Sequence, residues 1–185
     1  MFFRPIICHR LFFALRPPPA LAEQIAGSAQ WFGGEGRFVL ADNLHITLDI
    51  SHDYPSFPDS LADAMLHAGA MVAAAPVPVV LDEANGKGGQ VVLRPQRPIG
   101  ELSALYAELA AARAATGWSQ RRGYRFRPHS TLAYEAARDF RMAIRPIRWV
   151  ADEFVLIHSL VGRTQHRLLG RWPLRAENGR QPSLF

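Results

Sequence analysis

Two short segments of the sequence repeat the pattern His-x-Thr-Leu. They are residues 45–48 (HITL) and residues 129–132 (HSTL). Threonine is rare in this chain, since Thr116 and Thr164 are the only threonines outside the two segments. Composition alone would seldom produce the pattern twice, so we interpret the repeat as a functional signal.

Each motif predicts an imidazole and a hydroxyl side by side. Residues i and i+2 of a strand project from the same face, so His45 shares a face with Thr47, and His129 with Thr131. Two facing imidazoles can act as general base and general acid near pH 7. The hydroxyls can donate hydrogen bonds to a developing anion. This set suits in-line attack at the phosphorus of a phosphodiester, and in principle it needs no metal.

Other interpretations of the histidines are open. They could be polar residues satisfied at strand ends. A metal site is disfavoured, because no carboxylate or third histidine recurs beside both motifs. His52 and His166 lie near predicted turns and carry little signal, and we expect His158 to be buried and hydrogen-bonded rather than catalytic. The glycine-rich residues 33–36 lack the lysine and hydroxyl of a phosphate-binding loop, so we expect no ATP-dependent ligase and no cofactor.

Strands and helices must position the motifs. Two turn-rich links, residues 85–89 and 162–165, predict hairpins, and hairpins interspersed with helices favour an α+β fold with antiparallel sheet. We expect one domain over residues 1–175, followed by a polar tail over residues 176–185. Hydrophobic periodicity and helix breakers predict helices over 20–29, 59–75 and 101–115, and strands over 10–15, 44–48, 77–81, 90–93, 154–161 and 167–174. The tryptophans expected in the core or between lobes are Trp31, Trp118, Trp149 and Trp172.

Composition limits the class of protein. The chain has 185 residues, a formal net charge of +5, and 49% hydrophobic residues, which is typical of a folded domain. A lone cysteine, Cys8, excludes an intramolecular disulfide, and no apolar run is long enough to span a membrane. We therefore expect a cytoplasmic protein. All basic residues except Lys87 are arginines, which suits phosphate binding but is also what codon bias in a GC-rich genome produces.

Four arginines, Arg121, Arg122, Arg125 and Arg127, precede the second motif. On an extended strand Arg125 and Arg127 would share the face of His129, where their guanidinium groups could contact an RNA backbone. For Arg121 and Arg122 a solvated loop is an equally good interpretation. Arg127 is the favoured phosphate ligand, and Phe126 is expected to point into the core.

These features together resemble the two-histidine phosphoesterase superfamily, and within it the LigT-like RNA 2′,3′-cyclic phosphodiesterases, also called 2′-5′ RNA ligases. The resemblance runs from about residue 10 to residue 174. It implies a bilobal α+β fold with pseudo-twofold symmetry, in which two antiparallel sheets flank a central cleft and the helices lie outside. The segments that carry it are the two motifs, RLFFALRPP at 10–18, Asn43-Leu44, Phe126-Arg127-Pro128, and the C-terminal FVLIHS and HRLLGRWPL.

The resemblance also implies an activity: metal-independent hydrolysis of a 2′,3′-cyclic phosphate, on an RNA end or a nucleotide, to a 2′-phosphate. His45 would protonate the departing 3′ oxygen, and His129 would take a proton from the attacking water. Thr47 and Thr131 would hold phosphate oxygens. The order of the two histidines comes only from the family. The implied partners are RNA ends or nucleotides with a cyclic phosphate, with no membrane and no metal, and we expect a monomer.

The sequence also departs from the family pattern. Residues 49–52 (DISH) follow the first motif where relatives often have an apolar Phe-Leu-Gly, and Tyr134 stands where an arginine is frequent. Tyr134 could stack on a base or simply pack. Two alternatives therefore stay open: another specificity, such as ADP-ribose 1″,2″-cyclic phosphate or a 2′-5′ linkage, and a non-catalytic RNA or nucleotide binding module.

Overall fold

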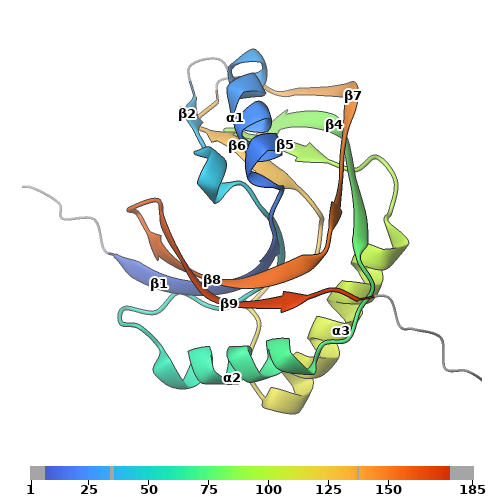
Figure 1. The fold of residues 1–185 in the computed structure, drawn as a ribbon. Helices are drawn as coiled ribbons and strands as arrows, with labels where there is room; N and C mark the ends of the chain where they lie inside the picture. Colours follow the sequence, from blue (N-terminus) through green and yellow to red (C-terminus); the bar gives the residue numbers. More distant parts are fainter. Residues whose placement is uncertain (1–6, 34–35, 137, 176–185) are drawn as a thin grey trace, which may run out of the picture.

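The computed structural model describes residues 7–33, 36–136 and 138–175, and the predicted tail over 176–185 lies outside these residues. The described chain is an α+β fold with three α-helices and a large antiparallel sheet (Figure 1). In chain order the elements are β1 (Cys8–Leu15), α1 (Pro19–Gly33), β2 (Arg37–Phe38), the 3-10 turn η1 (Ala41–Asn43), β3 (Ile46–Ile50), α2 (Asp59–Met71), β4 (Val77–Lys87), β5 (Gln90–Arg94), α3 (Gly100–Thr116), β6 (Ser130–Tyr134), β7 (Phe140–Ala151), β8 (Glu153–Val161) and β9 (Gln165–Pro173).

The strands form a single sheet in the order β7-β4-β5-β6-β3-β1-β8-β9, with β2 beside β6. The expectation of two separate sheets was therefore wrong. Two four-stranded halves, β3-β1-β8-β9 and β6-β5-β4-β7, are joined where Ile46 of β3 pairs with Ser130 of β6. We call them the first half and the second half.

The two halves share an irregularity as well as a strand order. Between β1 and β3 the register shifts at Leu48, and between β5 and β6 it shifts at Leu132. These are the last residues of the two His-x-Thr-Leu motifs, and both are fully buried. An extra residue on one strand is a β-bulge, which bends the strand and re-aims its neighbours. The leucine of each motif thus has a structural role. From the histidine to this leucine the side chains alternate between the two faces of the sheet, and at the leucine the bulge interrupts that alternation.

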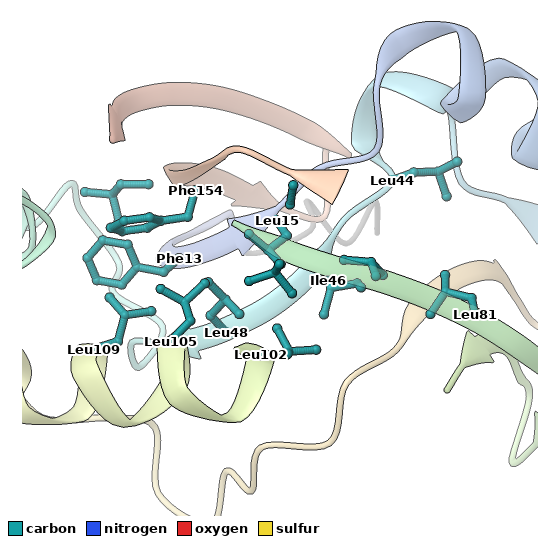
Figure 2. Packing of buried hydrophobic residues seen from close by; sticks show 14 of the residues in the cluster. Phe13, Leu15, Leu44, Ile46, Leu48, Leu81, Leu102, Leu105, Leu109 and Phe154 are labelled. Atoms are coloured by element: carbon teal, nitrogen blue, oxygen red, sulfur yellow. The ribbon is translucent and has the colours of Figure 1, made fainter. Parts of the chain in front are cut away.

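The main core lies between one face of the sheet and the helices. Figure 2 shows Phe13, Ile46 and Leu48 of the sheet facing three leucines of α3, namely Leu102, Leu105 and Leu109. Helices α2 and α3 lie side by side beneath the first half, whereas α1 lies against β2 and β6 (Figure 1). Helix α1 follows β1 of the first half yet packs on the second, whereas α3, which follows β5 of the second half, packs on β3 of the first half and on β4 of the second. Helix α3 therefore bridges the two halves.

Two expectations about the core and its edges need correction. Trp118 and Trp149 are buried and Trp172 packs beside Phe154, as expected, but Trp31 is 88% exposed. Strand β7 was not predicted, because its sequence mixes arginines and Pro146 with apolar residues. It is an edge strand paired only with β4, and charged residues and proline are common on exposed edges.

None of the helices in the described residues combines the length and the apolar character needed to cross a membrane.

Candidate active site

The junction between the two halves brings the two motifs together. Strands β3 and β6 are antiparallel and Ile46 pairs with Ser130, so extending the register by one residue sets His45 opposite Thr131, and Thr47 opposite His129. Ile46 and Ser130 are buried on the core side, so these four side chains project from the other side of the sheet. We call this side the open face.

Both histidines are held in the same way. Nδ1 of His45 lies 2.6 Å from the carbonyl oxygen of Asn43, and Nδ1 of His129 lies 2.7 Å from that of Arg127. A carbonyl oxygen can only accept, so each Nδ1 carries a proton and donates it. In each neutral imidazole Nε2 is then the free acceptor, and it is the atom available to exchange a proton with a substrate. Turn η1 supplies the Asn43 carbonyl, while the Asn43 amide donates to the carbonyl of Thr164.

An aromatic and basic group surrounds His45. The Phe12 ring stacks on its imidazole, with ring centroids 4.7 Å apart, and His166 approaches edge-on at 5.5 Å. Burial, together with the charges of His166, His129 and Arg16, lowers the pKa of His45 to about 4, although the Asn43 hydrogen bond opposes this. Burial and then the Arg16 charge lower the pKa of His166 to about 4 as well. Both imidazoles are neutral in the free protein at pH 7, and His166, which the sequence analysis set aside, belongs to this site.

Two arginines that the sequence analysis missed stand beside the catalytic candidates. Leu15 pairs with Ile46 and Leu93 pairs with Ser130, so the same registers place Arg16 opposite His45, and Arg94 opposite His129. A second internal repeat could have revealed them, because residues 15–17 and 93–95 both read Leu-Arg-Pro. The guanidinium of Arg16 donates to the carbonyl of Asp42 at 2.7 Å. Each histidine therefore has a cationic neighbour across from it: Arg16 directly after β1, and Arg94 at the end of β5.

The arginines before the second motif do not lie on a strand. Strand β6 begins at Ser130, so the predicted strand faces for Arg125 and Arg127 were wrong. Arg121 forms an ion pair with Asp53, at 2.6 Å. The carbonyl oxygen of Arg127 accepts the hydrogen bond from His129, and the exposed side chain of Arg127 lines a pocket next to the motif. Phe126 packs against the core and stacks on Tyr106, as expected of an inward-facing residue.

Tyr134 lies on the open face. The bulge at Leu132 puts Ala133 on the core side, so Tyr134 returns to the side of Thr131. The guanidinium of Arg37 sits 5.1 Å from the centre of its ring. One face of the Tyr134 ring is therefore occupied, and Arg37 brings a positive charge beside it.

His158 is buried, as expected. Its Nε2 lies 3.0 Å from Nδ1 of His9, and the two rings stack. Within the part of the chain that the structure describes, no group of three or more histidine, cysteine or acidic side chains is arranged to hold a metal ion.

Fold and site together define a class of protein. In this class the sheet consists of two similar four-stranded halves, and each half presents one His-x-Thr pair on the same open face. The chain belongs to the 2′-5′ RNA ligase superfamily, whose family model matches residues 17–163. It is similar to Escherichia coli LigT complexed with 3′-AMP, with 28% identity and a TM-score of 0.72 over 91% of this chain and 99% of that one. Apo E. coli LigT gives 30% identity and a TM-score of 0.70 over 92% and 99%. The protein TT0787 of Thermus thermophilus, at 20% identity and a TM-score of 0.71 over 91% and 99%, supports the fold alone. No curated protein matches the chain.

Proposed function

We propose that this protein hydrolyses the 2′,3′-cyclic phosphate of an RNA end or a nucleotide to a 2′-phosphate. The observation that carries the proposal is the matched pair of imidazoles. His45 and His129 each donate from Nδ1 to the carbonyl two residues upstream, and each leaves Nε2 free on the open face with a threonine across from it. A nucleotide substrate is supported by the similarity to E. coli LigT, solved with 3′-AMP.

The proposed step moves one proton to each side of the phosphorus. As a water oxygen attacks phosphorus, Nε2 of His129 takes its proton, and the bond from phosphorus to the 3′ oxygen breaks. Protonated Nε2 of His45 gives its proton to that departing oxygen. The hydroxyls of Thr47 and Thr131 donate to the non-bridging oxygens. The products are a 2′-phosphate and a free 3′-hydroxyl, and exchange of protons with solvent restores the two histidines.

If His45 is the acid, binding of the substrate must raise the pKa of its imidazole. In the free protein the lowered pKa of His45 keeps its imidazole neutral at pH 7. A phosphodiester anion against Nε2 favours the imidazolium and raises that pKa, since an opposite charge within a few ångströms stabilises the charged form. On this proposal His45 gains its proton as the substrate binds.

We expect kcat/KM to fall as the pH rises from 7 to 9. His45 must carry a proton to act as the acid, and because its pKa in the free protein is about 4, the protonated fraction falls about tenfold with each pH unit above that value. Initial rates at low concentrations of a nucleoside 2′,3′-cyclic phosphate between pH 6 and 9 would measure the effect, with circular dichroism to show that the fold persists. A kcat/KM that stays level or rises between pH 7 and 9 while the protein is folded contradicts the assignment of His45 as the acid.

The product identifies the reaction itself. Phosphorus NMR distinguishes a 2′-phosphate from a 3′-phosphate and from uncleaved cyclic ester, and only the first agrees with the proposed breakage. The substrates tested should include ADP-ribose 1″,2″-cyclic phosphate and a 2′-5′-linked dinucleotide. These phosphodiesters also contain a phosphorus atom open to attack by water and a leaving oxygen that an imidazole can protonate.

A second candidate is nucleotide binding without turnover. It is favoured by the solved structures of the similar E. coli LigT with ATP and with NADP+, neither of which is a cyclic phosphodiester. Titration calorimetry with these nucleotides, next to an assay on the cyclic esters, separates the two candidates. Tight binding with no consumption of any cyclic ester would select the binding module.

A further inference from the structure

A pocket at one end of the second half adjoins the segment that leads into the second histidine motif. It has a volume of about 530 Å³ and lies between the end of β5 with the loop that follows it, residues 94–99, the start of α3 at Ser103, and the segment 126–128 that leads into His129. Its side-chain lining includes four arginines and one carboxylate: Arg94, Arg97, Arg127, Arg141 and Glu83. None of the four motif residues lines it, so it is a neighbour of the catalytic candidates rather than their own cleft.

The charged side of the pocket shares a face with the motif. Leu93 is fully buried on the core side, so the next residue, Arg94, projects from the open face, where the register sets it opposite His129. Glu83 pairs with Arg94 across β4 and β5, and it lies on the same face. A group bound at His129 is thus one strand away from this pocket, at the cross-strand separation of about 5 Å.

The pocket is built around a buried carboxylate. The side chain of Glu83 is only 5% exposed and accepts from Nε of Arg94 at 2.6 Å and from Nε of Arg141 at 2.7 Å. The hydrogen bond from Arg141 is the main reason that the pKa of Glu83 lies below its usual value. Both carboxylate oxygens are therefore occupied. The guanidinium groups stay partly in solvent, Arg94 at 39% and Arg141 at 68%, with donors left to bind an anion.

We propose that this pocket binds the phosphate on the 5′ oxygen of the nucleoside whose cyclic phosphate lies at His45 and His129. The proposal rests on the proposed function. Arginines held in fixed positions suit phosphate oxygens, and the four positive charges exceed the single negative one that Glu83 supplies. In an RNA end that 5′ oxygen carries the next phosphodiester of the chain. The pocket would therefore make the protein prefer RNA ends to nucleosides with a free 5′-hydroxyl.

Three substrates test the source of that phosphate: a nucleoside 2′,3′-cyclic phosphate with a free 5′-hydroxyl, its 5′-phosphorylated form, and a dinucleotide ending in the cyclic phosphate. We expect kcat/KM to be at least tenfold higher for the last two. In the variant Arg97→Gln/Arg141→Gln, the ratio of dinucleotide to free 5′-hydroxyl substrate should fall at least tenfold. Arg94 is left intact because it stands opposite His129. The matched control, Arg175→Gln, removes an exposed arginine beyond β9 and should keep the parent ratio.

A binding measurement separates failure of this inference from failure of the proposed function. A dinucleotide ending in a 3′-phosphate, titrated at several salt concentrations, needs no turnover. The parent should bind it more tightly than a nucleoside 3′-phosphate, and the double variant should lose about two units of the slope of log K against log salt. Equal affinities for the two ligands, or an unchanged slope and an unchanged kinetic ratio in the double variant, would overturn the subsite even if the protein hydrolyses cyclic phosphates.

Discussion

Replacing His45 or His129 by alanine is expected to lower kcat on a 2′,3′-cyclic phosphate by about a hundredfold to ten-thousandfold. Each change removes one end of the proton transfer, while the partner imidazole keeps its carbonyl hydrogen bond to Asn43 or Arg127. Because the two histidines act in one step, the double variant should be scarcely slower than the worse single variant. Steady-state rates at pH 7, with circular dichroism of each variant, measure the effect.

The matched control for these variants is His67→Ala. His67 is an exposed histidine of α2, on the helix-covered side of the sheet, and its loss should leave kcat unchanged. Parent rates in His45→Ala or His129→Ala, or a double variant slowed by the product of the single effects, would show that the two imidazoles do not act together on one phosphorus.

Arg113→Ala is expected to cost about 3–5 kcal/mol of unfolding free energy, because it leaves the buried carboxylate of Asp49 without its cation. The bulge at Leu48 turns Asp49 toward α3, where its side chain is fully buried and paired with Arg113. Nε2 of Gln120 and the backbone N–H of Ile50 complete the hydrogen bonds of the carboxylate, at 2.6 and 2.8 Å. Urea unfolding of parent and variant measures the difference.

Asp49→Asn/Arg113→Ala is the informative comparison. Removing the charge together with its partner should recover part of the loss, because an amide in the apolar interior costs less than an unpaired carboxylate. Burial already raises the pKa of Asp49 despite the nearby cation, which agrees with a large desolvation penalty. If Arg113→Ala is as stable as the parent, or if the double variant is the less stable of the two, the carboxylate does not depend on its cation.

The sequence predicted helices and strands best where the hydrophobic periodicity and the helix-breaking residues, glycine and proline, indicate the same boundaries. The helices around Met65 and Leu105 and the strand that opens the chain were predicted within a few residues of their observed bounds. The hairpin between β4 and β5 was also predicted, but β4 continues to Lys87, where the predicted strand ended at residue 81. Helix α3 ends at Gly117, which has a φ of 74° and suits a left-handed cap. The repeated His-x-Thr-Leu motif predicted that two distant segments supply one site from opposite sides, and the register at Ile46 and Ser130 instead brings them together on one face of one sheet.

What the sequence missed depends on pairing between distant strands. Alternation alone does not show that β3 and β6 join, so one sheet could not be told from two. It also does not reveal a bulge, and the bulge is what sends Asp49 into the core and Tyr134 onto the open face. Arg16 and Arg94 precede proline turns, which made them look like parts of linkers until the register set them opposite the histidines. His166 lay beyond a turn, and only the fold brings it to His45.

The nesting of the two halves has a consequence for synthesis of the chain. The second half spans residues 77–151 and is inserted into the first, whose strands come from residues 8–50 and 153–173. Strand β1, apolar and buried over Leu11–Leu15, is made early, yet its partner β8 emerges from the ribosome only after the whole second half. Until then one edge of β1 stays unpaired, and exposed apolar strand edges promote aggregation. The order of the strands along the chain therefore makes the nascent protein most vulnerable just before its last hairpin is translated.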